Sequence, residues 1–256
     1  MSSKFLTVIR SNASFVLNGV LPKLLSGKAD FRRALMFCLN YRRRGIASLF
    51  VSGYPATLHQ DLQRSGAAFA AYLPSIKEAN KATSKSAPFF DAIACEDMTT
   101  ARAIARNSRA ALNAEEEYED DFLYVTFLMK RFFYQTPAAD LQATLDRYRD
   151  VLEGAEDHRF SICESFLLNR NDLFEASLEK LIQQRDEHYR QGMESESILE
   201  EEWATEGKLF VEGLALLRLA RAHGFSIQEN YLFIPSIALE PARISIDPDG
   251  WRTPGD

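Results

Sequence analysis

The residues Asn113–Tyr134, "NAEEEYEDDFLYVTFLMKRFFY", join a dense run of acids to a strongly apolar segment. After Phe122 this segment is apolar on almost every side of a helix, and such a helix belongs in the interior of a domain. Asn113 is a good N-cap and Glu116 lies at the capping-box position, so the helix is predicted to begin at Asn113. Because no sustained alternation of apolar and polar residues occurs between turn signals anywhere in the chain, a sizeable sheet is not expected. The stretch therefore predicts an all-α fold around a central helix.

Helix start and stop signals recur along the rest of the chain. Asp30 and Asp157 are N-caps, either Asp97 or Thr99 is another, and Gly45 is a predicted stop after three arginines. The predicted helices cover residues 31–45, 57–73, 89–95, 101–112, 113–134, 138–153, 158–170, 172–191 and 203–223. The segment after them is apolar but punctuated by prolines, which predicts an extended C-terminal tail laid against the helices. The expected fold is all-α, with about ten helices in irregular antiparallel pairs that form a solenoid-like or orthogonal bundle.

Charge is distributed unevenly along the chain. Residues 1–85 hold 13 Lys and Arg against 3 Asp and Glu, whereas residues 86–256 hold 17 Lys and Arg against 33 Asp and Glu. The net charge of the whole chain is −6. The sign changes in the polar connector Glu78–Pro88, which predicts a basic N-terminal helical subdomain (1–85) and an acidic helical domain (86–256), or one continuous domain. The two parts either steer a charged partner or dock on each other, and both explanations stand.

The chain is expected to be cytoplasmic. Its N-terminus lacks a continuous apolar core and a cleavage site, so no signal peptide is predicted. No window reaches the roughly 18 uninterrupted apolar residues that a membrane span needs, so no membrane partner is expected. The three cysteines, Cys38, Cys95 and Cys163, are odd in number and widely spaced, which fits a reducing compartment.

The sequence contains no complete catalytic or metal-binding motif. Four scattered histidines without a Glu-x-x-His spacing argue against a metal bundle, and no phosphate-binding loop, zinc motif or nucleophile elbow occurs. We therefore expect no enzyme activity, no catalytic residue, no metal and no cofactor. Arg218 and His223 form an Arg-x-x-x-x-His spacing that resembles the motif of helical ribonucleases of the HEPN group, which gives an alternative function. The helix dipole also explains a basic last turn. No aromatic platform accompanies the three consecutive arginines Arg42, Arg43 and Arg44, so nucleic acid is not an expected partner.

Two acidic runs are the candidate binding residues. They comprise Glu115, Glu116, Glu117, Glu119, Asp120 and Asp121, and then Glu200, Glu201 and Glu202. A calcium loop would need a Gly turn and alternating ligands, which are absent. A helix start needs only one or two acids, and clustered acids repel one another unless solvent or a basic partner relieves them. Solvated helix starts and partner contacts both explain the runs.

Three segments carry a family resemblance. "FFDAIACEDMTTARAIARNS" (89–108), "EEEYEDDFLYVTFLM" (115–129) and "EEWATEGKLFVEGLALLRLARAHG" (201–224), followed by "YLFIP", resemble the immunity protein 49 family of bacterial polymorphic-toxin and type VI secretion systems. The resemblance covers about residues 85–240. It implies an all-helical, non-catalytic protein that binds a cognate toxin and neutralises it.

The expected partner is thus a toxin domain with a basic active-site surface, which the acidic runs would occlude, and the toxin's target would be cytoplasmic. The family carries no fixed site residues that transfer to this chain, so the acidic positions are predicted from charge and expected exposure. A helical scaffold with a peptide-binding concave face is a third possibility.

Overall fold

The computed structural model describes residues 3–255, in which the chain forms eleven α-helices and no sheet. One isolated bridge joins Tyr231 and Ile234. The all-α prediction is therefore confirmed. The helices are α1 (Ser3–Leu25), α2 (Phe31–Ser52), α3 (Pro55–Tyr72), α4 (Ala87–Ala94), α5 (Met98–Asn107), α6 (Glu119–Phe133), α7 (Ala138–Leu152), α8 (His158–Leu168), α9 (Asn171–Glu194), α10 (Glu200–Ala204) and α11 (Val211–His223). Short 3-10 turns are η1 (Leu73–Ser75), η2 (Glu78–Asn80), η3 (Ser236–Leu239) and η4 (Gly250–Arg252).

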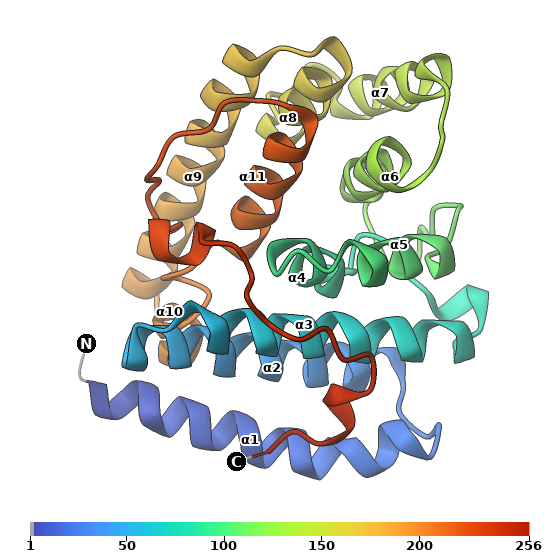
Figure 1. Ribbon diagram of the computed structural model, residues 1–256. Coiled ribbons are helices and arrows are strands. Elements are labelled where there is room, and N and C mark those ends of the chain that lie inside the picture. Colours follow the sequence, from blue (N-terminus) through green and yellow to red (C-terminus); the bar gives the residue numbers. More distant parts are fainter. Residues whose placement is uncertain (1–2, 256) are drawn as a thin grey trace.

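The helices form two stacked parts joined by α4. In Figure 1, α1, α2 and α3 lie along one another at the bottom, and α6 to α9 and α11 lie above α4 and α5. Successive helices pack as pairs, α1 with α2, α2 with α3, α6 with α7 and α8 with α9. None of the described helices combines the length and apolar character needed to cross a membrane.

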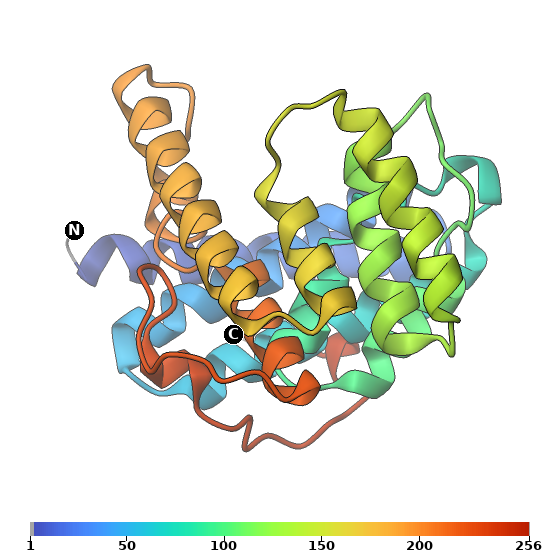
Figure 2. The ribbon, with the colours of Figure 1, turned by 90° about the horizontal axis from the view of Figure 1, so that it is seen from above.

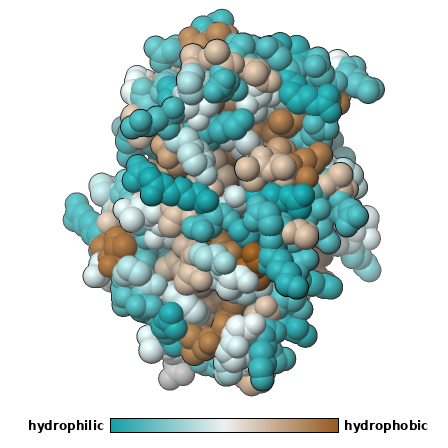
Figure 3. All heavy atoms as spheres, turned by 90° about the vertical axis from the view of Figure 1, so that its right-hand side faces the viewer, coloured by the Kyte–Doolittle hydropathy of each residue, from teal (hydrophilic) through white to brown (hydrophobic). Residues whose placement is uncertain are grey.

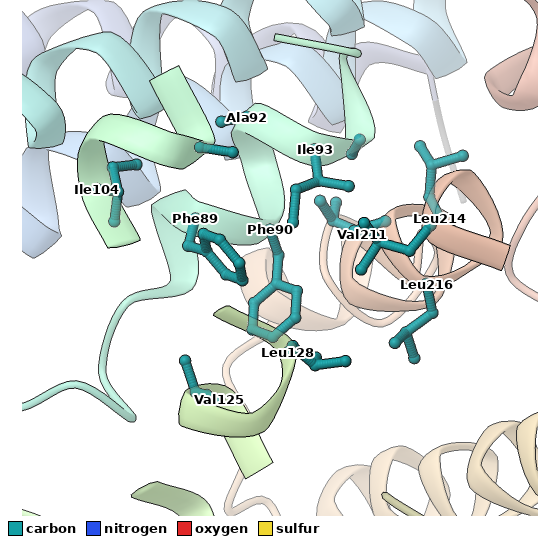
Figure 4. Packing of buried hydrophobic residues seen from close by; sticks show 14 of the residues in the cluster. Phe89, Phe90, Ala92, Ile93, Ile104, Val125, Leu128, Val211, Leu214 and Leu216 are labelled. Carbon is teal, nitrogen blue, oxygen red and sulfur yellow. The ribbon is translucent and has the colours of Figure 1, made fainter. Parts of the chain in front are cut away.

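The short helix α4 is the centre of the core. Seven of its eight residues are buried, and it packs against α2, α3, α5 and α11. Figure 4 shows Phe89 and Phe90 directed toward α6, and Ile93 toward Val211 of α11. The Phe89 ring lies edge-on to Phe133 at 5.3 Å between centroids. Because α4 contacts both parts, its position relates the lower helices to the upper ones.

A buried carboxylate on α4 ties three helices together. Asp91 is 1% exposed, and it accepts hydrogen bonds from Arg42 Nε of α2 (2.7 Å) and Ser65 Oγ of α3 (2.6 Å). Arg42 also donates to the carbonyl of Ala87 at 2.8 Å. With both carboxylate oxygens bonded, the cost of taking the charges out of water is offset by direct partners.

The three consecutive arginines of α2 all have acidic partners. Arg43 Nε lies 3.0 Å from Glu206, and Arg44 binds Asp61 of α3 with two hydrogen bonds of 2.7 and 2.8 Å. Together with the pair of Arg42 and Asp91, Arg43 links the basic part of the sequence to the acidic part. Internal charge matching thus accounts for part of the asymmetry. The division at residues 85 and 86 stays a prediction, and the core cluster contains residues from both sides of it.

The C-terminal segment lies across the helices as an extended tail, as predicted. Figure 1 shows it running from α11 down past α3 to the lower helices. Trp251 is buried, its carbonyl accepts from Tyr41 Oη at 2.8 Å, and the carbonyl of Asp247 accepts from Gln63 at 3.1 Å. Arg44 reaches the carbonyl of Pro254 at 2.7 Å. The tail is therefore part of the packed structure.

The predicted stop at Gly45 was wrong, because α2 continues to Ser52 and is capped by Gly53 in the left-handed region (φ 72°). A Cβ on Gly45 would lie 3.2 Å from the carbonyl oxygen of Leu58 and 3.0 Å from Cβ of Asp61. Gly45 therefore permits the close approach of α2 and α3, which is a tertiary requirement. The helix α1 before it was not predicted from the sequence.

The predicted helix start at Asn113 was also wrong. Asn113 is buried, and its side-chain amide donates to the carbonyls of Ala79 (3.0 Å) and Lys81 (2.9 Å) in the connector. Residues 114–117 form turns, and α6 begins only at Glu119. Pairing the buried side-chain amide of Asn113 with carbonyls of another segment here outweighs local capping. Eight residues of α6 are buried, in agreement with the predicted core helix.

The predicted helix 203–223 is divided in two. The chain leaves α10 at Ala204 and re-enters a helix at Val211. In the turn between them, a Cβ on Gly207 would lie 2.6 Å from the carbonyl oxygen of Trp203, so only glycine fits. The backbone of Phe210 then donates to the carbonyl of Phe233 at 2.8 Å, which binds the start of α11 to the C-terminal segment.

The substitution Asp91→Ala tests the central ion pair. Removing the carboxylate leaves Arg42 largely buried and without its anionic partner, so we expect the free energy of unfolding to fall by about 3–5 kcal/mol. Urea denaturation followed by circular dichroism measures this. The control is Asp146→Ala, which removes an exposed pair with Arg149 and should cost less than about 1 kcal/mol. Equal losses for the two variants would contradict the role given to Asp91.

Candidate functional site

The first acidic run, Glu115–Asp121, which we term the acidic turn, lies beside the connector 78–88. Glu117 accepts hydrogen bonds from the backbone N–H of Ser84 (2.6 Å) and of Asn113 (3.2 Å). Glu116 forms an ion pair with Lys85 at 2.9 Å, and both side chains are about half exposed. One acid therefore holds the turn in shape, and its neighbour is partly neutralised.

The acids at the start of α6 face arginines of α7 and α8. Glu119 is bound by Arg147 through two hydrogen bonds of 2.7 and 2.8 Å, and these bonds lower the pKa of Glu119. Asp121 lies 2.6 Å from Arg159, and Asp120 lies 3.7 Å from the same guanidinium. The negative charges at the N-terminus of α6 also suit its dipole. These three carboxylates are explained by contacts within the chain.

The outer edge of the acidic turn is the part that is accessible to a partner. Glu115 is exposed and has no ion-pair or hydrogen-bond partner in the described part of the chain, and Tyr118 is 80% exposed. The connector to which this turn is bonded lies at the right of Figure 1, on the side that faces the viewer in Figure 3. There the apolar atoms form separate small areas divided by hydrophilic ones. This side carries no single continuous apolar patch.

The second acidic run, Glu200–Glu202, forms the first turn of α10. The carboxylate of Glu201 lies 3.8 Å from Arg43. The side chains of Glu200 and Glu202 have no ion-pair or hydrogen-bond partner among residues 3–255. The run is therefore less neutralised by the protein itself than the acidic turn.

A surface hollow lies between the end of α9 and α10, and we term it the α9–α10 hollow. Its volume is about 580 Å³, and it is lined by Met193, Glu196, Ile198, Leu199, Glu200, Trp203 and Lys208. The Lys208 ammonium lies 3.5 Å from the centroid of the Trp203 ring. Of the predicted residues only Glu200 lines it. The sequence analysis missed the others, although the apolar residues set between acids in "ESESILEEEW" (194–203) were a usable signal.

The structure does not bring Arg218 and His223 together. Five residues turn a helix so that their side chains leave it roughly 140° apart. Arg218 is 3% exposed, pairs with Glu96 at 3.0 Å, and donates to the carbonyls of Leu239 (3.0 Å) and Glu240 (2.6 Å). His223 accepts from Arg131 at Nδ1 (3.0 Å) and packs edge-on against Phe166, Phe225 and Phe132. Neither side chain is free to meet a phosphate, so we carry the ribonuclease alternative no further.

Other chemically reactive groups are buried in structural positions. Cys38, Cys95 and Cys163 are free and fully buried, and burial raises the pKa of each thiol. Within the described residues, no group of three or more His, Cys, Asp or Glu side chains is arranged to hold a metal ion.

Comparison with known families decides the class of protein. The family model described as "Immunity protein 49" matches residues 54–238. The chain belongs to the immunity protein 49 family. No curated protein and no solved structure matches the chain. Immunity proteins are generally not enzymes, and membership of this family implies a toxin protein as the partner.

The immunity protein 49 match includes both acidic runs and the α9–α10 hollow. It also includes α3, which the resemblance seen in the sequence left out, and it excludes α1 and α2. The Asp91 of the Phe-Asp-Ala-Ile helix is the buried ion-pair residue of α4. A segment that carries the family resemblance is thus part of the core.

One buried histidine, His59, and one partly buried histidine, His223, should make the stability depend on pH. His59 is fully buried, donates from Nε2 to the carbonyl of Ala238 (3.1 Å), and has no partner at Nδ1. Desolvation lowers the pKa of His59 and of His223, and nearby Arg218 and Arg131 lower them further. On lowering the pH, the unfolded chain therefore takes up protons at these two positions before the folded protein does, with an unfolded pKa of about 6.5.

We therefore expect stability to be fully present above about pH 6.5 and to fall as pH drops below it, by at most about 1.4 kcal/mol per pH unit for each histidine. Urea denaturation between pH 7.5 and 5 measures the slope. His59→Gln, which keeps a donor for Ala238, should reduce the slope, and His188→Gln at an exposed position should leave it unchanged. A slope that His59→Gln does not alter would exclude His59 as a source.

Proposed function

We propose that this protein neutralises a cognate secreted bacterial toxin by binding it stoichiometrically and blocking its active site in the cytoplasm. The observation that carries the proposal is the immunity protein 49 match over residues 54–238. The three buried free thiols support a reducing compartment, in keeping with a toxin of a polymorphic-toxin or type VI secretion system that acts on a cytoplasmic target.

The acidic character of the chain supports a basic partner surface. Active sites that bind nucleic acid or other anionic substrates are basic, and a partner of opposite sign captures them quickly. We propose that both acidic runs contribute. Within the first run, Glu115, Glu116 and Tyr118 at the outer edge are the available residues, because Glu117, Glu119 and Asp121 are held by the protein itself.

Co-expression tests the function directly. Cells that express the toxin-like gene adjacent to this one should stop growing, and co-expression of this protein should restore growth. The two purified proteins should form a complex of fixed stoichiometry, measured by size-exclusion chromatography with light scattering. Asp91→Ala at a temperature where it is unfolded is the negative control. Absence of both protection and binding for the adjacent gene product would overturn the proposal.

Charge reversal tests the acidic turn. Glu115→Lys places a positive charge at the edge of a negative surface, so association with the toxin should slow by about threefold and depend less on salt. The matched control is Glu229→Lys, an exposed acid in the C-terminal segment with the same change of net charge. Stopped-flow association at two salt concentrations measures both. An unchanged rate for Glu115→Lys would remove the acidic turn from the interface and leave the function standing.

A further inference from the structure

The α9–α10 hollow is lined by both apolar and acidic side chains. Its apolar lining residues are Met193, Ile198, Leu199 and Trp203, and its acidic ones are Glu196 and Glu200. Leu199 is 70% exposed. Figure 2 shows α9 extending beyond the neighbouring helices, with the chain turning back toward α10 at its far end. The hollow therefore lies at an accessible corner of the molecule.

The turn that forms the hollow is held rigidly against the end of α9. The backbone N–H groups of Ser197 and Ile198 donate to the carbonyl of Gly192 at 2.9 and 3.2 Å. A Cβ on Gly192 would lie 2.2 Å from Cδ1 of Ile198, so glycine is required for this packing. Glu196 adopts a left-handed backbone (φ 55°), which costs about 1 kcal/mol for such a residue. A turn held in this way needs little reorganisation when a partner binds.

The carboxylates around the hollow are not neutralised by the chain. The side chains of Glu196 and Glu200, which line the hollow, and those of Glu194 and Glu202 nearby in the sequence have no ion-pair or hydrogen-bond partner within residues 3–255. The acidic turn differs in this respect, because its acids at the start of α6 lie against Arg147 and Arg159. Carboxylates that lack a partner within the chain are available to a segment that brings positive charge.

The aromatic wall of the hollow already holds one cation. Lys208 lies over the Trp203 ring, and no carboxylate of the described chain is within ion-pair distance of its ammonium group. The Trp203 ring also lies 6.1 Å from that of Tyr189, which helps to fix its orientation. Aromatic walls beside carboxylates suit Lys and Arg side chains, whose stems are apolar and whose heads are charged.

We propose that the α9–α10 hollow is the contact that receives a basic segment of the toxin, with an apolar side chain seated on Leu199 and Trp203 and flanking Lys or Arg residues at Glu196 and Glu200. This inference rests on the proposed function. Its basis is complementarity between the unpaired carboxylates of Glu196 and Glu200 and a basic active-site surface, together with the apolar side chains that line the hollow. Energetically dominant contacts are enriched in Trp, Tyr and Arg, which Trp203 and a basic segment would supply here.

The experiment measures binding of the purified toxin domain encoded by the adjacent gene, using calorimetry and stopped-flow association. Leu199→Asp should weaken binding by about 30-fold or more, since it places a charge among the apolar lining residues of the hollow. Glu196→Lys with Glu200→Lys should slow association by about tenfold and flatten its salt dependence. Circular dichroism and thermal unfolding verify that each variant is folded.

The matched controls are Leu232→Asp and Glu229→Lys. Leu232 is 58% exposed, and its neighbour Tyr231 bonds Glu175, which lies about 27 Å along α9 from Met193. Both controls should bind within about twofold of the unaltered protein. If the unaltered protein binds and the hollow variants bind equally well, this inference fails and the proposed function stands. If the unaltered protein binds no toxin, both fail. Self-association that Leu199→Asp abolishes, with toxin binding unchanged, would assign the hollow to a second copy of the chain and overturn the inference.

Discussion

The buried carboxylate of Asp91 is the interaction on which the arrangement of the helices depends. It lies on α4, the most central helix, and binds side chains of α2 and α3 through both of its oxygens. A charge in such a place is tolerated only if its partners are correctly positioned, because an unpaired buried charge costs several kcal/mol. The same helix presents Phe89, Phe90 and Ile93 to α6 and α11. One eight-residue helix thereby sets the relation between the two stacked parts of the fold.

The C-terminal segment completes that relation from the outside. Arg218 on α11 donates to consecutive carbonyls of residues 238–240, and His59 on α3 also donates to the carbonyl of Ala238. Further along, Trp251 packs edge-on against Phe37 at 6.1 Å. Buried backbone carbonyls outside regular structure need donors, and buried side chains of two helices supply them here. Arg218, which the sequence made a candidate catalytic residue, is thus used to hold the tail.

The predicted binding residues have both local and tertiary determinants. The two acidic runs were visible in the sequence, but their free carboxylates were not. Glu119 pairs with Arg147, which is 28 residues away, and Arg43 of α2 reaches Glu206, 163 residues away. The hollow at the end of α9 was missed because it needs α9 and α10 to meet through a tight turn, and the sequence predicted α10 as the start of one longer helix. Only the fold shows which acids stay available for a partner.

The sequence by itself determined the helical class, most helix boundaries and the family. Asp30, Asp97 and Asp157 cap their helices as local chemistry predicts, since each side chain accepts a backbone N–H two or three residues later. For residues whose sequence context allows two roles, the tertiary structure decided which role they have. Gly45 serves close helix packing instead of ending a helix, and Asn113 binds the connector instead of capping α6. The physical reason is that caps and turns depend on neighbours within four residues, whereas packing and charge pairing depend on residues that only the folded chain brings together.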